Sequence, residues 1–165
     1  KDGIPYCGFV FFGLIKVGGD PFVIEYNCRL GDPETEVILP RVQSDLLHVF
    51  DSLCTGMLTE VDVVIEERAA STVILASGGY PGAYEKGMEI EGLDALNGID
   101  GMVFHAGTKE VRRKVLSNGG RVLALTGFGL DLESALKNSY QLAARVNFDG
   151  AFCRNDIGAD VMESI

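Results

Sequence analysis

The sequence predicts an α+β fold in two parts. We expect residues 1–68 to form a β-hairpin, a loop and a helix, and residues 69–165 to form a small, mostly antiparallel sheet with one helix packed against it. Short apolar runs between turn-forming residues indicate strands, and two stretches with apolar residues at helical spacing indicate helices. The pattern loosens and charges collect in TEVDVVIEERAA, residues 59–70, which places the boundary between the two parts there.

The first part opens with two apolar runs, residues 6–15 and 22–26. They flank KVGGDP, whose glycines and aspartate favour a turn, so a β-hairpin is expected. GDPETEVILP then predicts a loop that opens into a short helical turn, with Pro33 near its start. Ser44 is the expected N-cap of a helix whose apolar spacing continues to Gly56.

The second part begins with candidate strands. Asn118-Gly119 joins the last two, and this dipeptide favours the positive φ values of a type I′ hairpin turn. Asp131 is the expected N-cap of a helix with one apolar stripe, and the tail FDGAFCRNDIG predicts a further short strand and a turn. The four strands are expected at 72–76, 102–105, 111–116 and 121–126.

Charge and composition exclude several classes of function. The formal net charge of −10 opposes binding to nucleic acid or to an anionic membrane, and no apolar run reaches the roughly 20 residues that span a bilayer. The four cysteines are scattered without a C-x-x-C pair and only two histidines accompany them, which argues against a zinc site. Reduced thiols in a cytoplasmic protein are the expectation.

The stretch FVIEYNCRLGDPE carries the candidate site. Side chains alternate between the two faces of a strand, so Glu25, Asn27 and Arg29 are expected on one face. The strand then runs into a turn that adds Asp32 and Glu34. An ordinary strand whose polar side meets water is the alternative, although asparagine is a poor strand former.

These side chains suit phosphate chemistry. Mg²⁺ prefers oxygen ligands and is often held by one or two protein oxygens together with substrate phosphates, so Glu25 and Asn27 are candidate ligands. Arg29 is placed to counter the charge that develops on a transferring phosphoryl group or an acyl phosphate. Phosphoryl transfer depends mainly on such positioning and charge neutralisation.

Several motifs resemble one family when taken together and in order. They are VIEYNCRLGDPETEVILPRVQSDLL, GGYPGAYEKG, VFHAGT, NGGRVLALT and CRNDIG. In this order they resemble the phosphoribosylamine–glycine ligase (glycinamide ribonucleotide synthetase) family of the ATP-grasp superfamily, from Tyr6 to Gly158. The resemblance implies that residues 1–68 are the C-terminal part of an ATP-grasp domain and residues 69–165 the family's C-terminal domain.

The implied activity is ATP-dependent ligation of glycine to 5-phosphoribosylamine through a glycyl phosphate, giving glycinamide ribonucleotide, ADP and phosphate in purine biosynthesis. Glu25 and Asn27 match the family's ligands for Mg²⁺ (or Mn²⁺), and Arg29 matches the arginine that contacts the acyl phosphate. Asp32 and Glu34 match the turn beside the reacting amine and are expected to position substrate. ATP, glycine and 5-phosphoribosylamine are the implied small-molecule partners.

The resemblance also implies that the nucleotide-clamping half of the ATP-grasp module lies upstream in the same polypeptide, so the chain alone is expected to be inactive. Two alternatives stay open. One is another ATP-grasp carboxylate–amine ligase, because Glu-x-Asn-x-Arg fits many of them, although RLGDPE favours the glycine enzyme. The other is a non-catalytic docking or dimerisation module of a longer purine-synthesis polypeptide.

Overall fold

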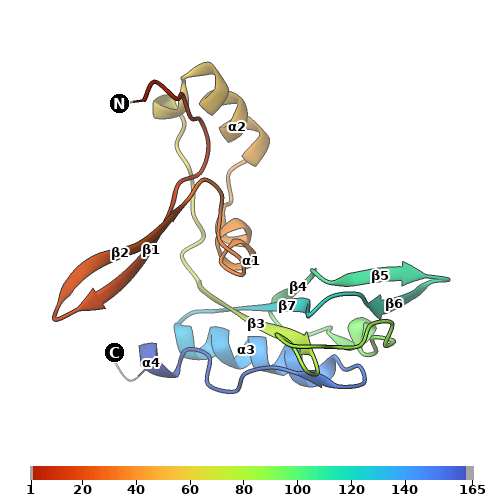
Figure 1. Ribbon diagram of the computed structural model, residues 1–165. Coiled ribbons are helices and arrows are strands. Elements are labelled where there is room, and N and C mark those ends of the chain that lie inside the picture. The colour runs from red at the N-terminus through yellow and green to blue at the C-terminus, as the bar shows by residue number, and fades with distance from the viewer. Residues whose placement is uncertain (1, 163–165) are drawn as a thin grey trace. The chain divides into compact units, whose positions relative to one another are not determined.

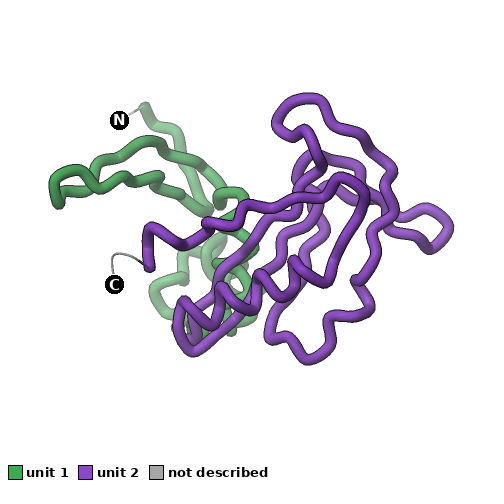
Figure 2. Tube along the Cα trace, turned by 90° about the horizontal axis from the view of Figure 1, so that it is seen from below, with its two compact units in different colours: residues 1–66 green, residues 67–165 purple. Residues whose placement is uncertain are grey.

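The computed structural model describes residues 2–162 and divides the chain into two compact units, residues 1–66 (unit 1) and 67–165 (unit 2), coloured separately in Figure 2. The elements of unit 1, labelled in Figure 1 where there is room, are β1 (Phe11–Val17), β2 (Asp20–Asn27), α1 (Thr35–Ile38), η1 (Leu39–Arg41), α2 (Leu46–Thr55) and η2 (Leu58–Glu60). Those of unit 2 are β3 (Ala69–Ser77), η3 (Leu93–Ala95), β4 (Gly101–His105), β5 (Thr108–Val111), β6 (Lys114–Ser117), β7 (Arg121–Gly129), α3 (Leu132–Arg145), β8 (Ala151–Phe152) and α4 (Ala159–Met162).

The predicted N-terminal hairpin is confirmed, with shifted ends. β1 and β2 pair antiparallel, and Gly18 and Gly19 form the turn with φ values of 59° and 101°. β1 begins at Phe11 rather than at Tyr6, because the preceding backbone leaves the strand conformation and the Tyr6 hydroxyl bonds to the Phe9 carbonyl, 2.7 Å away. The register shifts after Gly13, and Ile24 is the extra residue of a β-bulge.

The helix after the loop begins one residue later than predicted. Asp45, not Ser44, is the N-cap of α2, and its Oδ1 accepts hydrogen bonds from the backbone nitrogens of Leu47 and His48. Ser44 Oγ instead accepts a hydrogen bond from Val64 N, 2.8 Å away, which ties the start of the helix to the segment after it. The predicted end is confirmed, since Gly56 adopts the left-handed conformation that terminates helices.

Unit 2 is an antiparallel sheet with one helix packed on it, as predicted. Its strand order is β4-β7-β3-β8, and α3 lies along one face in Figure 1. Asp131 caps α3 as predicted, and hydrogen bonds from the Ser134 side chain and backbone hold the pKa of Asp131 below its usual value. The core cluster lies between sheet, helix and loops: Leu75, Ile90, Val122, Leu123, Leu125, Leu142, Val146 and Phe148.

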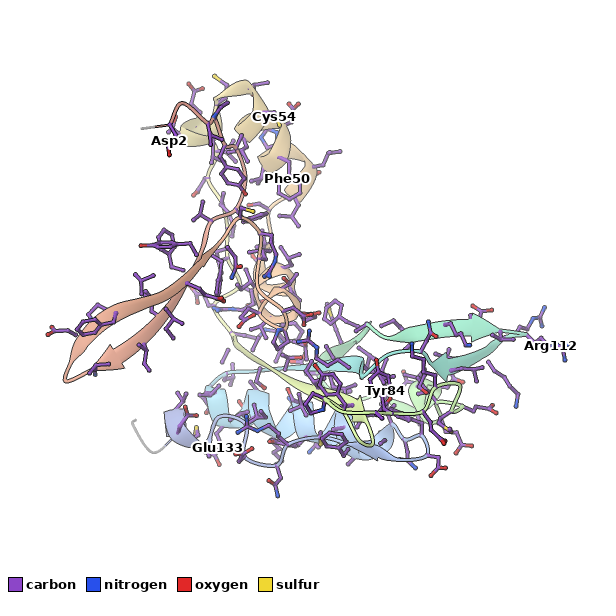
Figure 3. All side chains as sticks on the ribbon, in the orientation of Figure 1. Asp2, Phe50, Cys54, Tyr84, Arg112 and Glu133 are labelled. Atoms are coloured by element: carbon purple, nitrogen blue, oxygen red, sulfur yellow. The ribbon has the colours of Figure 1, made fainter. Side chains whose placement is uncertain are left out.

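Two details of unit 2 differ from the prediction. Residues 111–116 are not one strand, because the chain turns at Arg112 and Arg113 and forms the β5–β6 hairpin. Arg112, labelled in Figure 3, lies at the tip of this hairpin. Asn118-Gly119 does not form a type I′ turn either: β6 pairs with β5 and not with β7, and neither residue has a positive φ.

Close approach of backbones replaces side-chain packing where α3 crosses β7. A Cβ atom added at Gly127 would collide with backbone atoms of Ala135 and Ser139. Ser139, which is fully buried, accepts a hydrogen bond from Gly127 N at 2.9 Å and lies 2.7 Å from Ser71 Oγ. The helix is therefore held to the sheet by a buried polar contact that only a glycine at position 127 permits.

None of the helices in residues 2–162 has the length and apolar character needed to cross a membrane.

We predict that Gly127→Ala destabilises unit 2. The added methyl group forces α3 away from the sheet, and overpacking of this kind costs about 1–3 kcal/mol of the free energy of unfolding. Chemical denaturation followed by circular dichroism measures the loss. Leu130→Ala is the control, because Leu130 is 92% exposed and its truncation is expected to change stability by less than about 0.5 kcal/mol. Equal stability of Gly127→Ala and the parent would contradict the close-packing account.

Candidate functional site

The structure brings two of the predicted site residues together at the end of the first hairpin. Glu25 and Asn27 are the last two alternate residues of β2, and both leave the strand on the same side. Asn27 Nδ2 donates a hydrogen bond to Glu25 Oε1 at 3.0 Å, and the Glu25 side chain is exposed. The two side chains therefore place carboxylate and amide oxygens close together at the end of β2.

Arg29 does not share the strand with this pair, which corrects the sequence prediction. β2 ends at Asn27, and the chain bends at Cys28 and Arg29. The Cys28 carbonyl accepts a hydrogen bond from the hydroxyl of Tyr6, a residue distant in the sequence, at 2.8 Å instead of continuing the ladder. The exposed Arg29 guanidinium donates through Nη1 to the Leu30 carbonyl at 3.1 Å, so strand alternation does not determine its direction.

The turn after Arg29 is closed by Thr35. Thr35 Oγ1 donates to the carbonyl of the buried residue Gly31 at 2.6 Å, and Thr35 N donates to the same oxygen at 3.1 Å. Asp32 and Glu34 lie in this turn with exposed side chains, and the Glu34 carboxylate folds back over Gly31. The turn thus holds two carboxylates close in sequence to the Glu25–Asn27 pair.

The sequence alone does not predict that Gly13 pairs directly with Glu25. Counting back regularly from the Gly18-Gly19 turn would place Ile24 opposite Gly13, but the bulge shifts the register and places Glu25 there. A Cβ atom at Gly13 would lie 2.9 Å from Glu25 Cγ. A glycine within an apolar run is the one sequence signal that could have indicated this close approach.

The donor set fits a hard divalent cation in part. Glu25 and Asn27 supply oxygen ligands, which Mg²⁺ prefers, and a site of this type takes its remaining ligands from water and phosphate. Within residues 2–162 no group of three or more histidine, cysteine, aspartate or glutamate side chains is arranged to hold a metal ion. Two oxygen donors would fill only part of the coordination shell of such a cation.

The hairpin that bears the pair is unusually exposed. Apart from the partly buried Phe11, its large apolar side chains are each at least 47% accessible to solvent, on both sides of the bulge. Isolated two-stranded hairpins are at best marginally stable in water, so a hairpin of this composition is typical of a sheet that continues into other strands. The exposed side chains are Phe12, Leu14, Ile15, Val17, Phe22, Val23, Ile24 and Tyr26.

The glycine-rich segment of unit 2, residues 77–87, has a structural explanation. The glycines of SGGYPGAYEKG allow backbone contacts, since a Cβ at Gly78 would lie 2.8 Å from the Gly150 carbonyl oxygen. A neighbouring cavity of about 210 Å³ is lined by Ser77, Gly78, Glu85, Met88, Asp149 and Gly150. Tyr84 of this segment, labelled in Figure 3, packs edge-on against Tyr80 with the ring centroids 6.1 Å apart.

His105 and the residues Arg154 and Asp156 also have local polar partners. His105 Nδ1 lies 3.1 Å from Thr108 Oγ1 beside the β4–β5 connection, which is a structural contact. Arg154 and Asp156 pair through two hydrogen bonds of 2.8 and 2.7 Å. These bonds raise the pKa of Arg154 and lower the pKa of Asp156. Both side chains are exposed, so solvent screens their attraction and the pair contributes little to stability.

Comparisons with known proteins relate this chain to the family that its sequence motifs resemble. A family model described as phosphoribosylglycinamide synthetase, C domain, matches residues 70–160. A phosphoribosylamine–glycine ligase of Pseudomonas syringae is 46% identical over 158 residues, which are 95% of this chain and 37% of the relative. The corresponding ligase of Salmonella typhimurium is 46% identical over 98% of this chain and 38% of its own length.

Two more relatives extend the comparison. The trifunctional purine biosynthetic protein adenosine-3 of Gallus gallus is 45% identical over 96% of this chain, which corresponds to 16% of that protein. The crystal structure of phosphoribosylamine–glycine ligase from Thermotoga maritima matches with a TM-score of 0.75 and 39% identity, covering 89% of this chain and 36% of that one. The chain thus spans well under half the length of these relatives. It belongs to the phosphoribosylamine–glycine ligase family, whose C domain it carries over residues 70–160.

Proposed function

We propose that this chain acts as part of an ATP-dependent ligase that joins glycine to 5-phosphoribosylamine and so makes glycinamide ribonucleotide, ADP and phosphate in purine biosynthesis. The observation that carries the proposal is the Glu25–Asn27 pair, with its 3.0 Å hydrogen bond, on an exposed hairpin of a chain that is 46% identical to relatives named phosphoribosylamine–glycine ligase. The cytoplasm, where the nucleotide and amino acid substrates are available, is the proposed location.

The reaction has two steps in this proposal. A carboxylate oxygen of glycine attacks the γ-phosphorus of ATP, the bond to the β,γ-bridging oxygen breaks, and glycyl phosphate and ADP form. The amine of 5-phosphoribosylamine then attacks the glycyl carbonyl carbon, loses a proton, and phosphate leaves. The first step gathers negative charge around the phosphorus, and the second forms an oxyanion at the carbonyl, so both require positioned positive charge.

In this proposal the residues of the hairpin and turn have separate roles in neutralising charge and positioning substrate. Glu25 and Asn27 would hold a divalent cation, Mg²⁺ or Mn²⁺, through their side-chain oxygens. Such a cation, when bound, neutralises charge on the triphosphate. Arg29 would donate hydrogen bonds to the acyl phosphate. The exposed carboxylates of Asp32 and Glu34 would position the amine substrate.

We further propose that residues 1–68 are the C-terminal part of an ATP-grasp domain, residues 69–165 are the C-terminal domain, and an upstream portion of the same polypeptide completes the nucleotide site. Two observations support this arrangement. The relatives are far longer than the segment that this chain matches. The apolar side chains of β1 and β2 other than Phe11 are exposed, as expected of strands that lie within a larger sheet.

The exposed hairpin also fits a second candidate, a docking or dimerisation module without catalytic residues. A third is a different ATP-grasp carboxylate–amine ligase. Incubation of the full-length protein with ATP, Mg²⁺, phosphoribosylamine and a panel of amino acids separates the three. Formation of glycinamide ribonucleotide with glycine alone supports the proposal, product from another carboxylate supports the different ligase, and absence of any product supports the docking module. The 165-residue chain by itself is expected to make no product.

Loss of either proposed metal ligand should weaken the use of Mg·ATP. We predict that Glu25→Gln and Asn27→Leu in the full-length protein raise the Mg²⁺ concentration needed for half-maximal ligase activity by at least about tenfold, since even supporting residues of metal sites change affinity by this factor. Steady-state kinetics over a Mg²⁺ titration measures it. Glu110→Gln, an exposed change on β5, is the matched control. An unchanged Mg²⁺ requirement in both variants would remove the pair from the metal site.

The arginine should contribute geometry as well as charge. We predict that Arg29→Lys lowers kcat by about 10²–10³-fold with little change in the KM for glycine, because lysine keeps the charge but loses the planar, bidentate donor fork. Ligase assays at saturating substrate give kcat. Arg113→Lys, at the β5–β6 turn, is the control and should be silent. Normal turnover in Arg29→Lys would exclude Arg29 from the mechanism.

A further inference from the structure

Gly13 occupies a position in the hairpin where glycine is not required by the backbone. It lies in β1 between Phe12 and Leu14, two large apolar residues typical of strands. The turn glycines Gly18 and Gly19 have the left-handed φ values that favour glycine, whereas Gly13 does not. Glycine inside a strand weakens it, because it gains more conformational freedom than other residues when the chain unfolds.

The contacts around Gly13 point to a reason for glycine at this position. Gly13 pairs directly with Glu25 across the hairpin. A Cβ atom added to Gly13 would lie 2.9 Å from Glu25 Cγ, while the next nearest atoms, Glu25 N and O, would be 3.6 Å away. The close contact at this position is therefore with a side chain, that of Glu25, and not with a backbone.

A side chain at position 13 would displace Glu25 Cγ, and a turn about the first side-chain bond of Glu25 is the movement that relieves the contact. The Glu25 carboxylate would then leave its place beside Asn27, and the 3.0 Å hydrogen bond between them would break. From these contacts we infer that Gly13 is a positioning residue for the metal-binding pair: its missing side chain is the space across which Glu25 reaches to lie beside Asn27. The inference rests on the proposed function, in which that pair holds the divalent cation.

The bulge offers a competing explanation for the glycine. The register shifts immediately after Gly13, and glycines are common beside bulges because they bend easily. A glycine needed for the bulge supports the fold of the hairpin, and its replacement lowers the unfolding temperature. A glycine needed for Glu25 supports the position of one carboxylate, and its replacement by alanine changes metal affinity without loss of stability.

The test measures metal binding and stability separately in the full-length protein. Mn²⁺ is the probe, and free Mn²⁺ is measured by electron paramagnetic resonance in the presence of ATP and absence of the other substrates. Gly13→Ala should weaken Mn²⁺ binding by about tenfold, the smaller end of the effect seen for residues that orient metal ligands. Its Tm, from differential scanning calorimetry, should be equal to or above that of the parent. Lys16→Ala, in the same strand and paired with Pro21, is the control and should change neither quantity.

A second background tests whether Gly13 acts through Glu25. Once Glu25→Ala has weakened Mn²⁺ binding, adding Gly13→Ala should change the remaining affinity by less than about twofold, because the side chain that it displaces is gone. Unchanged Mn²⁺ affinity in the Gly13→Ala single variant overturns the inference. A fall in Tm in both backgrounds also overturns it and assigns the glycine to the bulge. Full Mn²⁺ affinity in Glu25→Ala itself would instead overturn the metal site of the proposed function.

Discussion

The candidate site depends on the register of the β1–β2 hairpin, in which the bulge at Ile24 places Glu25 opposite Gly13. Regular pairing would have set Ile24 against the glycine and Glu25 against the bulky side chain of Phe12. With the bulge, the long Glu25 side chain extends across the space that Gly13 leaves and meets the amide of Asn27. The backbone register thus decides where the carboxylate lies before any ligand is considered.

Stability and candidate chemistry are unevenly divided between the two units. All the buried hydrophobic residues of the described chain, from Val73 to Phe148, belong to unit 2, whereas the hairpin with the candidate ligands leaves its apolar side chains exposed. A small antiparallel sheet with a closely packed helix can fold around its own core, but a two-stranded hairpin gains little by itself. The proposed upstream portion would therefore supply both the missing burial and the missing half of the nucleotide site.

Much of the fold could be predicted from the sequence because local signals and tertiary structure agree. Gly18-Gly19 forms the predicted turn, Asp131 the predicted cap and Gly56 the predicted helix end. The failures occur where tertiary contacts override local preference. Arg112 turns the chain without any turn residue in the sequence, and the Asn118 segment is drawn against Gly107 by a 2.7 Å backbone hydrogen bond instead of forming its own hairpin.

For the candidate site, strand alternation predicted only part of the geometry. Alternation correctly placed Glu25 and Asn27 on one side, but it failed for Arg29, because the distant Tyr6 hydroxyl takes the Cys28 carbonyl and ends the strand. The sequence around Cys28 contains no signal that predicts the hydrogen bond from Tyr6. The bulge cannot be predicted from the local sequence either, because Ile24 fits the apolar alternation of the strand equally well in a regular register and in a shifted one.

The net negative charge of the segment that carries the candidate site explains why the positions of its few ligand-binding side chains matter. Residues 21–40 carry four carboxylates and one cation, Arg29. A triphosphate approaching this segment would be repelled unless positive charge lay between, and the repulsion is strongest where solvent is excluded. In the proposed function, Glu25 and Asn27 would turn part of that negative surface into a cation site, so that the surplus of carboxylates would favour binding of the metal–nucleotide complex over the free nucleotide. In that proposal Arg29, the one cation of residues 21–40, would act on the group that carries the developing charge, and its direction, which the strand does not determine, would be the remaining geometric requirement of the site.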